Sequence, residues 1–258
     1  MTVFYFTSTG NCLAVAKKLD GNLVSIPQAI DTQGLHFQDD SIGLVFPIYG
    51  FGWPKMVQKF LQKATWEADY SFAIGTYGNL PGAAMMNLQN FVKNHGQRFD
   101  YAASLLMVDN YLPGFDMNAQ VAKLPEKRVD EHLAQIMADI QNRRKQNATA
   151  GLGWKAVTAL MKPAAGLILN GKQARQYTVD ENCIRCRVCA KVCPAGNITV
   201  SEKVVFAEQC EGCLGCVHLC PQNAIHMRHE KSAARWRNPE VSLNELIAAN
   251  NRQKEAGK

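Results

Sequence analysis

Several common signals are absent from this sequence of 258 residues, and each absence argues against a class of protein. The longest mainly apolar stretch, from Ala156 to Leu169, is interrupted by Lys162 and Pro163. It is shorter than the roughly 20 apolar residues that cross a bilayer, so we expect no transmembrane helix. The N-terminus has no charged region before its apolar residues and no small-residue cleavage site, so we expect no signal peptide.

Signals of catalysis are also scarce. No GxGxxG fingerprint follows a predicted strand, which disfavours direct use of NAD(P)H. The predicted loops carry no Ser-His-Asp set, no paired carboxylates and no zinc motif, so hydrolytic and covalent catalysis are unsupported. The six histidines show no metal-ligand spacing, and we expect His218 to be a solvated surface residue. The sequence therefore leaves open whether the protein is an enzyme.

Cysteine, in contrast, is abundant: eight of the nine cysteines stand in two runs, CIRCRVCAKVCP from Cys183 and CEGCLGCVHLCP from Cys210. Each run is CxxCxxCxxxCP, the bacterial ligand run for [4Fe-4S] clusters, in which three cysteines bind one cluster and the fourth binds the other. Three evenly spaced cysteines wrap one face of a cube, whereas the fourth, held by proline, points away. We therefore expect a first cysteine set and a second cysteine set, each holding one cluster: Cys183, Cys186, Cys189 and Cys220 in the first, and Cys210, Cys213, Cys216 and Cys193 in the second.

A zinc site or a disulfide framework is the alternative interpretation of these cysteines. Zinc usually takes its four ligands in two pairs, and disulfides need an oxidising compartment. Residues 175 to 230 resemble the bacterial two-cluster ferredoxin instead. Because such clusters are sensitive to oxygen, we expect a cytoplasmic protein.

The net charge of +6 does not indicate a nucleic-acid partner. From Lys172 onward there are 13 basic and 9 acidic residues. Each oxidised cluster with its four thiolates adds roughly two negative charges, so this half is near neutral when loaded. The remaining surplus is spread over residues 1 to 171 and is typical of a solvated surface.

The first 145 residues alternate between strand and helix patterns. Strands are expected at 2–6, 23–26, 41–48, 71–76 and 101–108, and helices at 13–19, at 56–61, from after residue 82 to about 94, and at about 120–145. The continuous apolar run at 41–48 is typical of a strand that is buried on both faces. This alternation predicts a doubly wound parallel sheet in an α/β domain.

Ligands of such sheets bind beyond the C-terminal ends of the strands. The first end is the hydroxyl-rich turn from Thr7 to Cys12, where hydroxyls and a helix N-terminus attract a phosphate. Helix capping without a ligand is the alternative role for this turn. The candidate cofactor-binding residues at the strand ends are Thr7, Ser8, Thr9, Gly10, Asn11, Cys12, Pro47, Tyr49, Gly50, Trp53, Thr76, Tyr77, Gly78, Asn79, Asp109, Asn110 and Tyr111.

These residues resemble those of the flavodoxin family, whose phosphate loop is roughly (T/S)xTGxT. Thr7, Thr9 and Gly10 match, and Cys12 departs where the family usually has a hydroxyl. The resemblance implies five strands in the order 2-1-3-4-5 and an FMN ring sandwiched by aromatic residues. The candidates for that stacking are Tyr49, Trp53, Tyr77 and Tyr111, although loop packing alone would also explain them. We expect FMN rather than FAD because only one phosphate site is visible.

Together with the two cysteine runs, the TGNC turn and the VDNYLPG loop make the whole chain resemble the EFR1-type family of flavodoxin and ferredoxin fusion proteins. The resemblance implies two [4Fe-4S] clusters, FMN and electron transfer. Three roles stay open: an oxidoreductase that reduces a substrate at the flavin, a carrier for a partner oxidoreductase, and a redox sensor. The expected partner is a redox protein or a small-molecule electron acceptor, with no nucleic acid and no membrane.

We expect four segments: a flavodoxin-like domain at 1–146, a linker at 147–174, a small α+β ferredoxin domain at 175–232, and a C-terminal helix and tail at 233–258. The linker is apolar and should pack against a domain. The alternative is an interfacial membrane anchor with Trp154, Leu160 and Leu167 opposite Lys155 and Lys162. Strand pairing is expected between 177–179 and 224–227, and in a hairpin between 198–201 and 203–206. A short helix is expected at 241–248, followed by a polar, frayed end.

Overall fold

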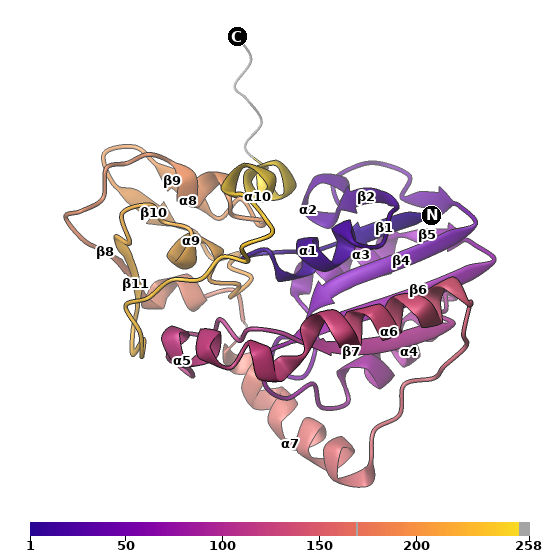
Figure 1. Ribbon diagram of the computed structural model, residues 1–258. Helices are drawn as coiled ribbons and strands as arrows, with labels where there is room; N and C mark the ends of the chain where they lie inside the picture. The colour runs from indigo at the N-terminus through magenta and orange to yellow at the C-terminus, as the bar shows by residue number, and fades with distance from the viewer. Residues whose placement is uncertain (169, 253–258) are drawn as a thin grey trace.

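The computed structural model describes residues 1–168 and 170–252. The N-terminal part (residues 1–146) is built on a five-stranded parallel sheet in the order β2-β1-β4-β6-β7 (Figure 1). Its strands are β1 (Thr2–Tyr5), β2 (Asn22–Ser25), β4 (Ser41–Pro47), β6 (Tyr70–Tyr77) and β7 (Tyr101–Leu106). Counted along the chain, this is the flavodoxin-like order 2-1-3-4-5, so the predicted fold class is confirmed.

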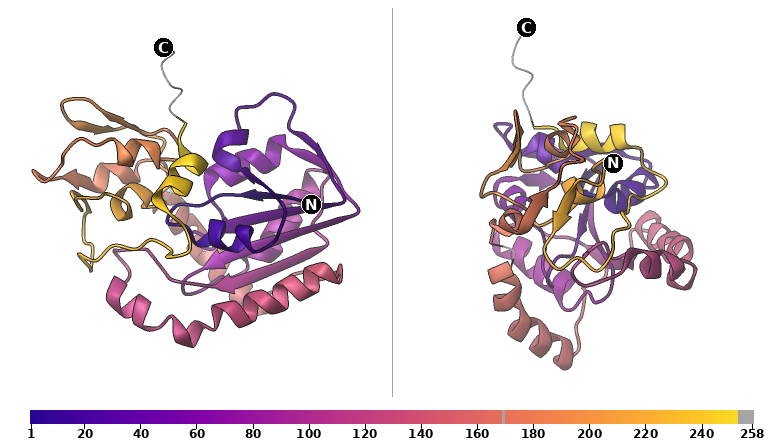
Figure 2. Two further views of the ribbon diagram at one scale, coloured as in Figure 1. Left: turned by 45° about the horizontal axis from the view of Figure 1, so that its top comes forward. Right: turned by 90° about the vertical axis from the view of Figure 1, so that its left-hand side faces the viewer.

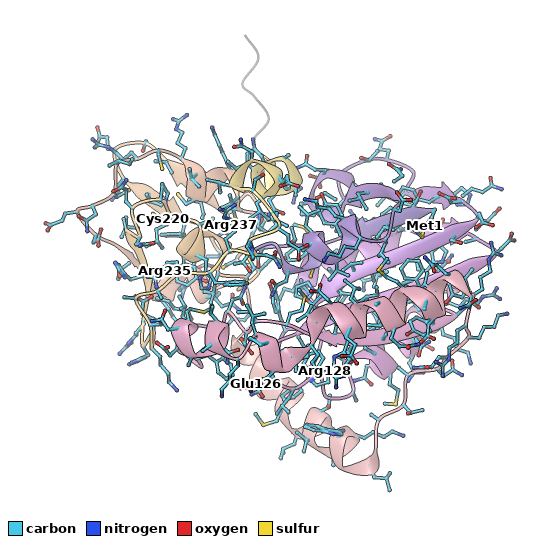
Figure 3. All side chains as sticks on the ribbon, viewed as in Figure 1. Met1, Glu126, Arg128, Cys220, Arg235 and Arg237 are labelled. Atoms are coloured by element: carbon cyan, nitrogen blue, oxygen red, sulfur yellow. The ribbon has the colours of Figure 1, made fainter. Side chains whose placement is uncertain are left out.

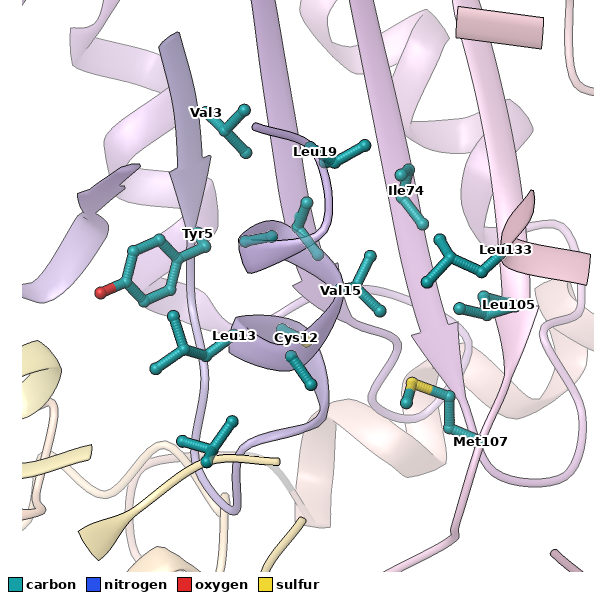
Figure 4. Close-up of a cluster of buried hydrophobic side chains, with 14 of the residues drawn as sticks. Val3, Tyr5, Cys12, Leu13, Val15, Leu19, Ile74, Leu105, Met107 and Leu133 are labelled. Atoms are coloured by element: carbon teal, nitrogen blue, oxygen red, sulfur yellow. The ribbon is translucent and has the colours of Figure 1, made fainter. Parts of the chain in front are cut away.

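Helices cover both faces of the sheet. One core cluster joins the sheet to α1 (Asn11–Lys17) and α6 (Val129–Gln141), and another joins it to α2 (Ile26–Ala29), α3 (Lys55–Lys63) and α4 (Ala84–Asn94). Figure 4 shows the first of these clusters, with Leu13 and Val15 of α1 packed against the strands. Because both faces are covered, the first six residues of β4 are all buried, as its apolar run indicated.

The prediction of one long helix at 120–145 is wrong. The chain forms α5 (Met117–Ala122), the 3-10 turn η1 (Pro125–Lys127) and then α6, with Glu126 and Arg128 at the break (Figure 3). Pro125 has no N–H for a helical hydrogen bond, and Arg128 adopts a left-handed conformation with φ of 46°. The break allows Lys127 to enter the protein, where its Nζ donates hydrogen bonds to the carbonyls of Gly78 and Met107.

Smaller differences concern the edges of the sheet. The fifth predicted strand ends at Leu106 rather than at residue 108. A separate two-stranded parallel ladder pairs β3 (His36–Gln38) with β5 (Thr65–Glu67), and the sequence patterns did not predict it. These strands are only three residues long, too short for a periodic pattern to stand out.

The cysteine-rich part (residues 175–232) has the two predicted antiparallel pairs. β8 (Tyr177–Val179) pairs with β11 (Ile225–Met227), and β9 (Ile198–Val200) pairs with β10 (Val204–Phe206). The short helices α8 (Val188–Lys191) and α9 (Gly215–His218) contact each other between these ladders, and η2 (Gln173–Gln176) leads into β8. This part is therefore a small α+β unit, as predicted.

The segment between the two parts contains a helix, α7 (Leu152–Ile168). Its Thr158 is buried and accepts a hydrogen bond from the N–H of Ala83, whereas Leu152 and Leu160 are 85% and 78% exposed. The side chains of Lys162 and Leu167, which the anchor interpretation invoked, lie outside the described residues. No helix in the described ranges is long and apolar enough to cross a membrane.

The chain then returns to the N-terminal part through α10 (Leu243–Asn250), which ends two residues beyond the predicted bounds. Ser242 and Glu245 form a capping box at its start. In Figures 1 and 2, α10 lies between the cysteine-rich part and α2, and it contacts both α2 and α8. The frayed end predicted after α10 falls largely on residues 253–258, outside the described residues.

Candidate functional site

A cavity of about 520 Å³ lies at the C-terminal ends of β1, β4, β6 and β7. We name it the large cavity, in contrast to the small cavities around the cysteines. Fifteen of the seventeen candidate cofactor-binding residues line it, and only Gly10 and Trp53 do not. The wall also contains residues that the sequence did not single out: Ile48, Phe51, Leu80, Val108, Gly114, Phe115, Met161, Gly212 and Leu214. This is the strand-end position at which doubly wound sheets bind their ligands.

Trp53 lies outside the cavity because of a tight turn. The backbone groups of Tyr49 and Gly52 hydrogen-bond each other, and Phe51 between them has a positive φ of 65°. This turn places Phe51 in the cavity wall, while Trp53 packs on Phe91 of α4 with ring centroids 5.5 Å apart. Trp53 is therefore not placed to stack on a ring in the cavity, and Phe51 is the aromatic residue available there instead.

The turn before α1 presents polar groups to the cavity. The hydroxyl Oγ1 of Thr7 is buried and has no hydrogen-bond partner among the described residues, and no side chain caps the N-terminus of α1. Thr9 Oγ1 accepts a hydrogen bond from Asn110 Nδ2 at 2.8 Å, and Ser8 Oγ lies 3.4 Å from the Tyr49 hydroxyl. A buried hydroxyl without a partner costs free energy, so Thr7 marks a place where a ligand acceptor fits.

Cys12 takes a structural place in this turn. Its Sγ lies 3.1 Å from the hydroxyl of Thr76, and burial raises the pKa of the thiol to about 12. The thiol is therefore neutral at physiological pH and unreactive as a nucleophile. The substitution of a thiol for the usual hydroxyl keeps a side-chain contact between the turn and β6.

Two further loops, which follow β6 and β7, meet in the cavity wall. A Cβ atom on Gly78 would lie 2.2 Å from Asp109 Cβ, so only glycine allows this close approach. Burial raises the pKa of Asp109, and its carboxylate accepts a hydrogen bond from the N–H of Tyr111. Since Lys127 also binds the carbonyls of Gly78 and Met107, the two loops are held together from behind.

The remaining wall is mainly apolar and aromatic. Leu80, Tyr111 and Met161 are partly exposed at the cavity, and Phe51 and Phe115 also line it. A polar turn and aromatic side chains in the wall of one cavity fit a ligand that has a phosphate and a flat ring. FMN has both features, so the residues present fit the cofactor that the resemblance implied.

The cysteines surround two smaller cavities in the grouping that shared ligation predicts. One cavity is lined by Cys183, Cys186, Cys189 and Cys220, and the other by Cys193, Cys210, Cys213 and Cys216. In the described part of the chain, no group of three or more His, Cys, Asp or Glu side chains could hold a single metal ion. A cubane cluster differs from a single ion because each cysteine binds a different iron at a separate corner.

The environment of the second set suits thiolates bound to iron. Burial raises the pKa of Cys213 and Cys216 well above the ordinary value for a thiol. These thiols therefore lose their protons only where positive charge, such as that of bound iron, stabilises the thiolates. Backbone N–H groups also point at the sulfurs: Gly212 donates to Cys210 Sγ and Asn197 to Cys193 Sγ, both at 3.3 Å. Such hydrogen bonds are a common way to tune cluster potentials.

The two cysteine sets differ in whether their cavity shares a wall with the large cavity. Leu214 lines both the large cavity and the cavity of the second set, and Gly212 also lines the large one. Gly215 packs on Ser8 of the turn before α1, and a Cβ atom on Gly215 would lie 3.7 Å from Ser8 Cβ. Among the described residues, the first set shares no wall with the large cavity, and its Cys186 is exposed. The second set is therefore the inner one and the first set the outer one.

The prediction that His218 is a solvated surface residue is wrong. His218 is buried, its Nε2 donates to the carbonyl of Asn110 at 2.7 Å, and its Nδ1 accepts from the N–H of Trp236 at 3.1 Å. Burial lowers its pKa to about 4, so the ring is neutral. Because Asn110 lies in the cavity wall, His218 joins α9 to the candidate flavin site. The contact spans 108 positions of sequence, and no local pattern indicated it.

Comparison with known proteins assigns the cysteine-rich part. Residues 175–221 match the family model of the 4Fe-4S dicluster domain. A protein of the ion-translocating oxidoreductase complex of Methanosarcina acetivorans is 48% identical over 51 residues, which are 19% of this chain and 19% of that protein. Polyferredoxin protein MvhB of Methanothermus fervidus is 47% identical over 51 residues, 19% of this chain and 12% of that protein. Pyruvate synthase subunit PorD of Methanocaldococcus jannaschii is 41% identical over 56 residues, 20% of this chain and 65% of that protein. The chain thus spans only a small part of the first two relatives.

Solved structures give weaker similarities. The two-electron reduced flavodoxin of Megasphaera elsdenii has a TM-score of 0.28 and 16% identity, covering 40% of this chain and 83% of that chain. The Trp repressor binding protein of Bacillus subtilis has a TM-score of 0.33 and 11% identity, covering 57% of this chain and 99% of that chain. At these TM-scores, the assignment of the N-terminal part rests on its own strand order. The chain thus joins a flavodoxin-like parallel sheet to a 4Fe-4S dicluster ferredoxin domain.

Proposed function

We propose that the protein is an electron-transfer flavoprotein that passes electrons between two [4Fe-4S] clusters and FMN. When bound, the clusters exchange single electrons and the flavin one or two, which couples one-electron to two-electron chemistry. In this proposal residues 1–146 hold FMN, residues 147–174 connect the domains, residues 175–232 hold the clusters, and residues 233–258 form the C-terminal segment. Oxygen-sensitive clusters also favour a cytoplasmic location.

The single observation that carries the proposal is the wall between the large cavity and the second cysteine set. Leu214 lines both, and its neighbour Cys213 belongs to the set. The rate of electron transfer falls steeply with the distance between cofactors. A flavin and a cluster that lie on the two sides of Leu214 would therefore be close enough for fast transfer. The outer set, with Cys186 exposed, is then the place where electrons enter from or leave to a partner.

Within this proposal, the residues of the N-terminal part bind and orient the flavin. The free hydroxyl of Thr7 and the uncapped start of α1 supply donors for a phosphate. FMN is favoured over FAD because the large cavity has this one phosphate-binding turn. Tyr49, Phe51, Tyr77 and Tyr111 exclude water from the ring with their aromatic faces.

Two roles are compatible with this arrangement. The partly exposed wall formed by Leu80, Tyr111 and Met161 leaves room for a small electron acceptor to approach the flavin. A carrier role is favoured by relatives that are named as components of an oxidoreductase complex and of pyruvate synthase. We propose a redox protein or a small-molecule acceptor as the partner, and a redox sensor as the weaker alternative.

Purification without oxygen tests the proposal directly. We expect about eight iron and eight sulfide per chain from two cubanes, and one FMN released on denaturation. Stopped-flow mixing of the reduced protein with candidate acceptors then separates the roles. Turnover of a small acceptor indicates an oxidoreductase, and transfer to a partner protein alone indicates a carrier. A preparation with full clusters and no affinity for FMN would contradict the flavin assignment.

A second prediction concerns the potentials of the clusters. Arg185 and Arg187 line the cavity of the first set, whereas Glu211 lines that of the second. Positive charge favours the more negative reduced cluster, so the first cluster should have the higher potential. We expect the change of Arg185 and Arg187 to Gln to lower the potential of the first cluster only, as measured by redox titration with EPR.

The matched control for this change is Arg175→Gln, because Arg175 forms an exposed ion pair with Glu208 and lines neither cysteine cavity. If the potentials stay constant while transfer to a partner loses its salt dependence, the arginines serve as a docking face for an acidic partner instead. If neither quantity changes, the arginines are ordinary surface charges.

A further inference from the structure

The last segment of the chain crosses from the cysteine-rich part to the turn before α1. We name residues 237–252 the C-terminal strap. It starts beside Trp236, whose N–H donates to His218 of α9, and Arg237 marks its beginning in Figure 3. It ends with α10 beside α2, as the views in Figures 1 and 2 agree. The strap therefore physically joins the cluster-binding part to the candidate flavin site.

The strap binds the turn before α1 (residues 7–12), and none of the strap's residues lines the large cavity. The N–H of Asn238 donates to the carbonyl of Thr9 at 2.8 Å, and its Nδ2 donates to Asn11 Oδ1 at 3.2 Å. At the other end of the strap, Asn250 Nδ2 donates to the carbonyl of Thr7 at 3.1 Å. Asn250 is 0% exposed, although it belongs to the last helix of the described chain.

The middle of the turn packs closely against the strap. Gly10 has a φ of 106°, and a Cβ atom there would lie 3.0 Å from Asn238 Cβ and 3.1 Å from Val241 Cβ. Glycine thus serves both the left-handed backbone and the close packing of the strap. This explains why Gly10 lies outside the cavity wall while its neighbours Thr9 and Asn11 line it.

These contacts determine which groups of the turn are left for a ligand. The carbonyls of Thr7 and Thr9 carry partial negative charge and would repel a phosphate if they faced the cavity. The strap supplies donors that hold both carbonyls on its own side. The hydroxyl of Thr7 and the N–H groups at the start of α1 remain available to an anion.

The strap is also anchored independently of the turn. Leu246 and Ala249 belong to the same buried cluster as Leu13 of α1. On α2, Gln28 Nε2 donates to the carbonyls of Ala249 and Asn251 at 3.3 and 2.9 Å. Gln28 therefore holds the strap without being hydrogen-bonded to the turn, which makes it a matched control.

We propose that Asn238 and Asn250 are positioning residues for the flavin phosphate, and that the strap couples the seating of the cluster-binding part to flavin binding. The proposal rests on the proposed function for the identity of the ligand. Its structural content, that the strap orders residues 7–12, does not depend on that identity. The two can therefore fail separately.

The test compares Asn250→Leu, Asn238→Ala and Gln28→Leu in the full chain with both clusters retained. We expect the dissociation constant for FMN to rise about tenfold in Asn250→Leu, which frees the Thr7 carbonyl, and about threefold in Asn238→Ala, which loses only the side-chain bond to Asn11. The Gln28 variant should change it less than about twofold. Hydrogen exchange of residues 7–12 without FMN should become faster in the asparagine variants only. Should Asn250→Leu fail to fold, Asn238→Ala carries the test, because it removes the side-chain hydrogen bond to Asn11 while the backbone hydrogen bond to Thr9 keeps the strap in place.

Equal effects in all three variants would show that the strap stabilises the protein in general and would overturn the proposal. Unchanged FMN affinity and unchanged exchange in both asparagine variants would overturn it as well. If the unmodified protein does not bind FMN, the proposed function fails. The exchange of residues 7–12 then still decides whether the strap orders the turn.

Discussion

Replacing Cys193 with alanine should remove the cluster of the second set and spare the cluster of the first set, although Cys193 follows Cys189 in the chain. The side chain of Cys193 lines the same cavity as Cys210, Cys213 and Cys216. The loss of one of four ligands typically costs a cubane its stability or converts it to a three-iron form. EPR of the reduced protein should show the loss of the second cluster's signal. Iron analysis should show about half of the iron lost if the cluster is lost, or about one iron lost if a three-iron form remains.

The matched variant is Cys220→Ala, which should do the reverse. Cys220 lines the cavity of the first set, so this change should remove the outer cluster while the inner one remains. If each variant instead loses the cluster of its own sequence run, the crossed assignment is wrong. Flavin content supplies a further readout. Among the described residues only the second set shares a wall with the large cavity, so a change in flavin content is expected in Cys193→Ala rather than in Cys220→Ala.

The fold class could be predicted because its signals are local. A strand buried on both faces, such as β4, is a continuous apolar run, and alternation with helices determines a parallel sheet. The two ladders of the cysteine-rich part, which were expected within the ferredoxin module, are also present. The break at Pro125 had a visible signal, since a proline inside a helical pattern usually ends or kinks the helix.

The residues that line the site could be predicted only where they directly follow a strand of the sheet. Residues that directly follow a parallel strand, such as Thr7 and Thr76, must lie at the ligand edge. Within a loop, the choice between Phe51 and Trp53 depends on the sign of one φ angle, which the sequence pattern does not encode. The two flanking glycines, Gly50 and Gly52, were the available hint of a tight turn at Phe51.

Contacts between distant segments could not be predicted from one sequence. Leu214 and Met161 reach the cavity from other segments, and His218 binds Asn110 across the domain boundary. A histidine has no pattern that distinguishes a buried, fully hydrogen-bonded ring from a solvated one. Asn250 is a similar case, because asparagine near the end of a chain is usually exposed.

The second large effect is expected at the turn before α1, where Thr9→Glu should abolish FMN binding. Thr9 lines the cavity and is 2% exposed, so a carboxylate there would lie next to the phosphate and repel it. Flavin content after purification and titration of the flavin-free protein with FMN measure this. Full cluster content and an unchanged circular dichroism spectrum in the same preparation show that both parts of the chain have folded. A normal flavin content in this variant would refute the assignment of the turn.

Thr7→Val is the more delicate form of the same experiment, because valine has nearly the shape of threonine and adds no charge. The Thr7 hydroxyl is buried without a partner among the described residues, so its removal should stabilise the flavin-free protein by about 1 kcal/mol. If the hydroxyl donates to the phosphate, the same change should weaken FMN binding about 10- to 100-fold, because hydrogen bonds to charged groups are the strong ones. A structural role predicts loss of stability with unchanged affinity, whereas the ligand role predicts gain of stability with loss of affinity. Thermal unfolding of the flavin-free protein and FMN titration therefore give opposite signs for the two roles.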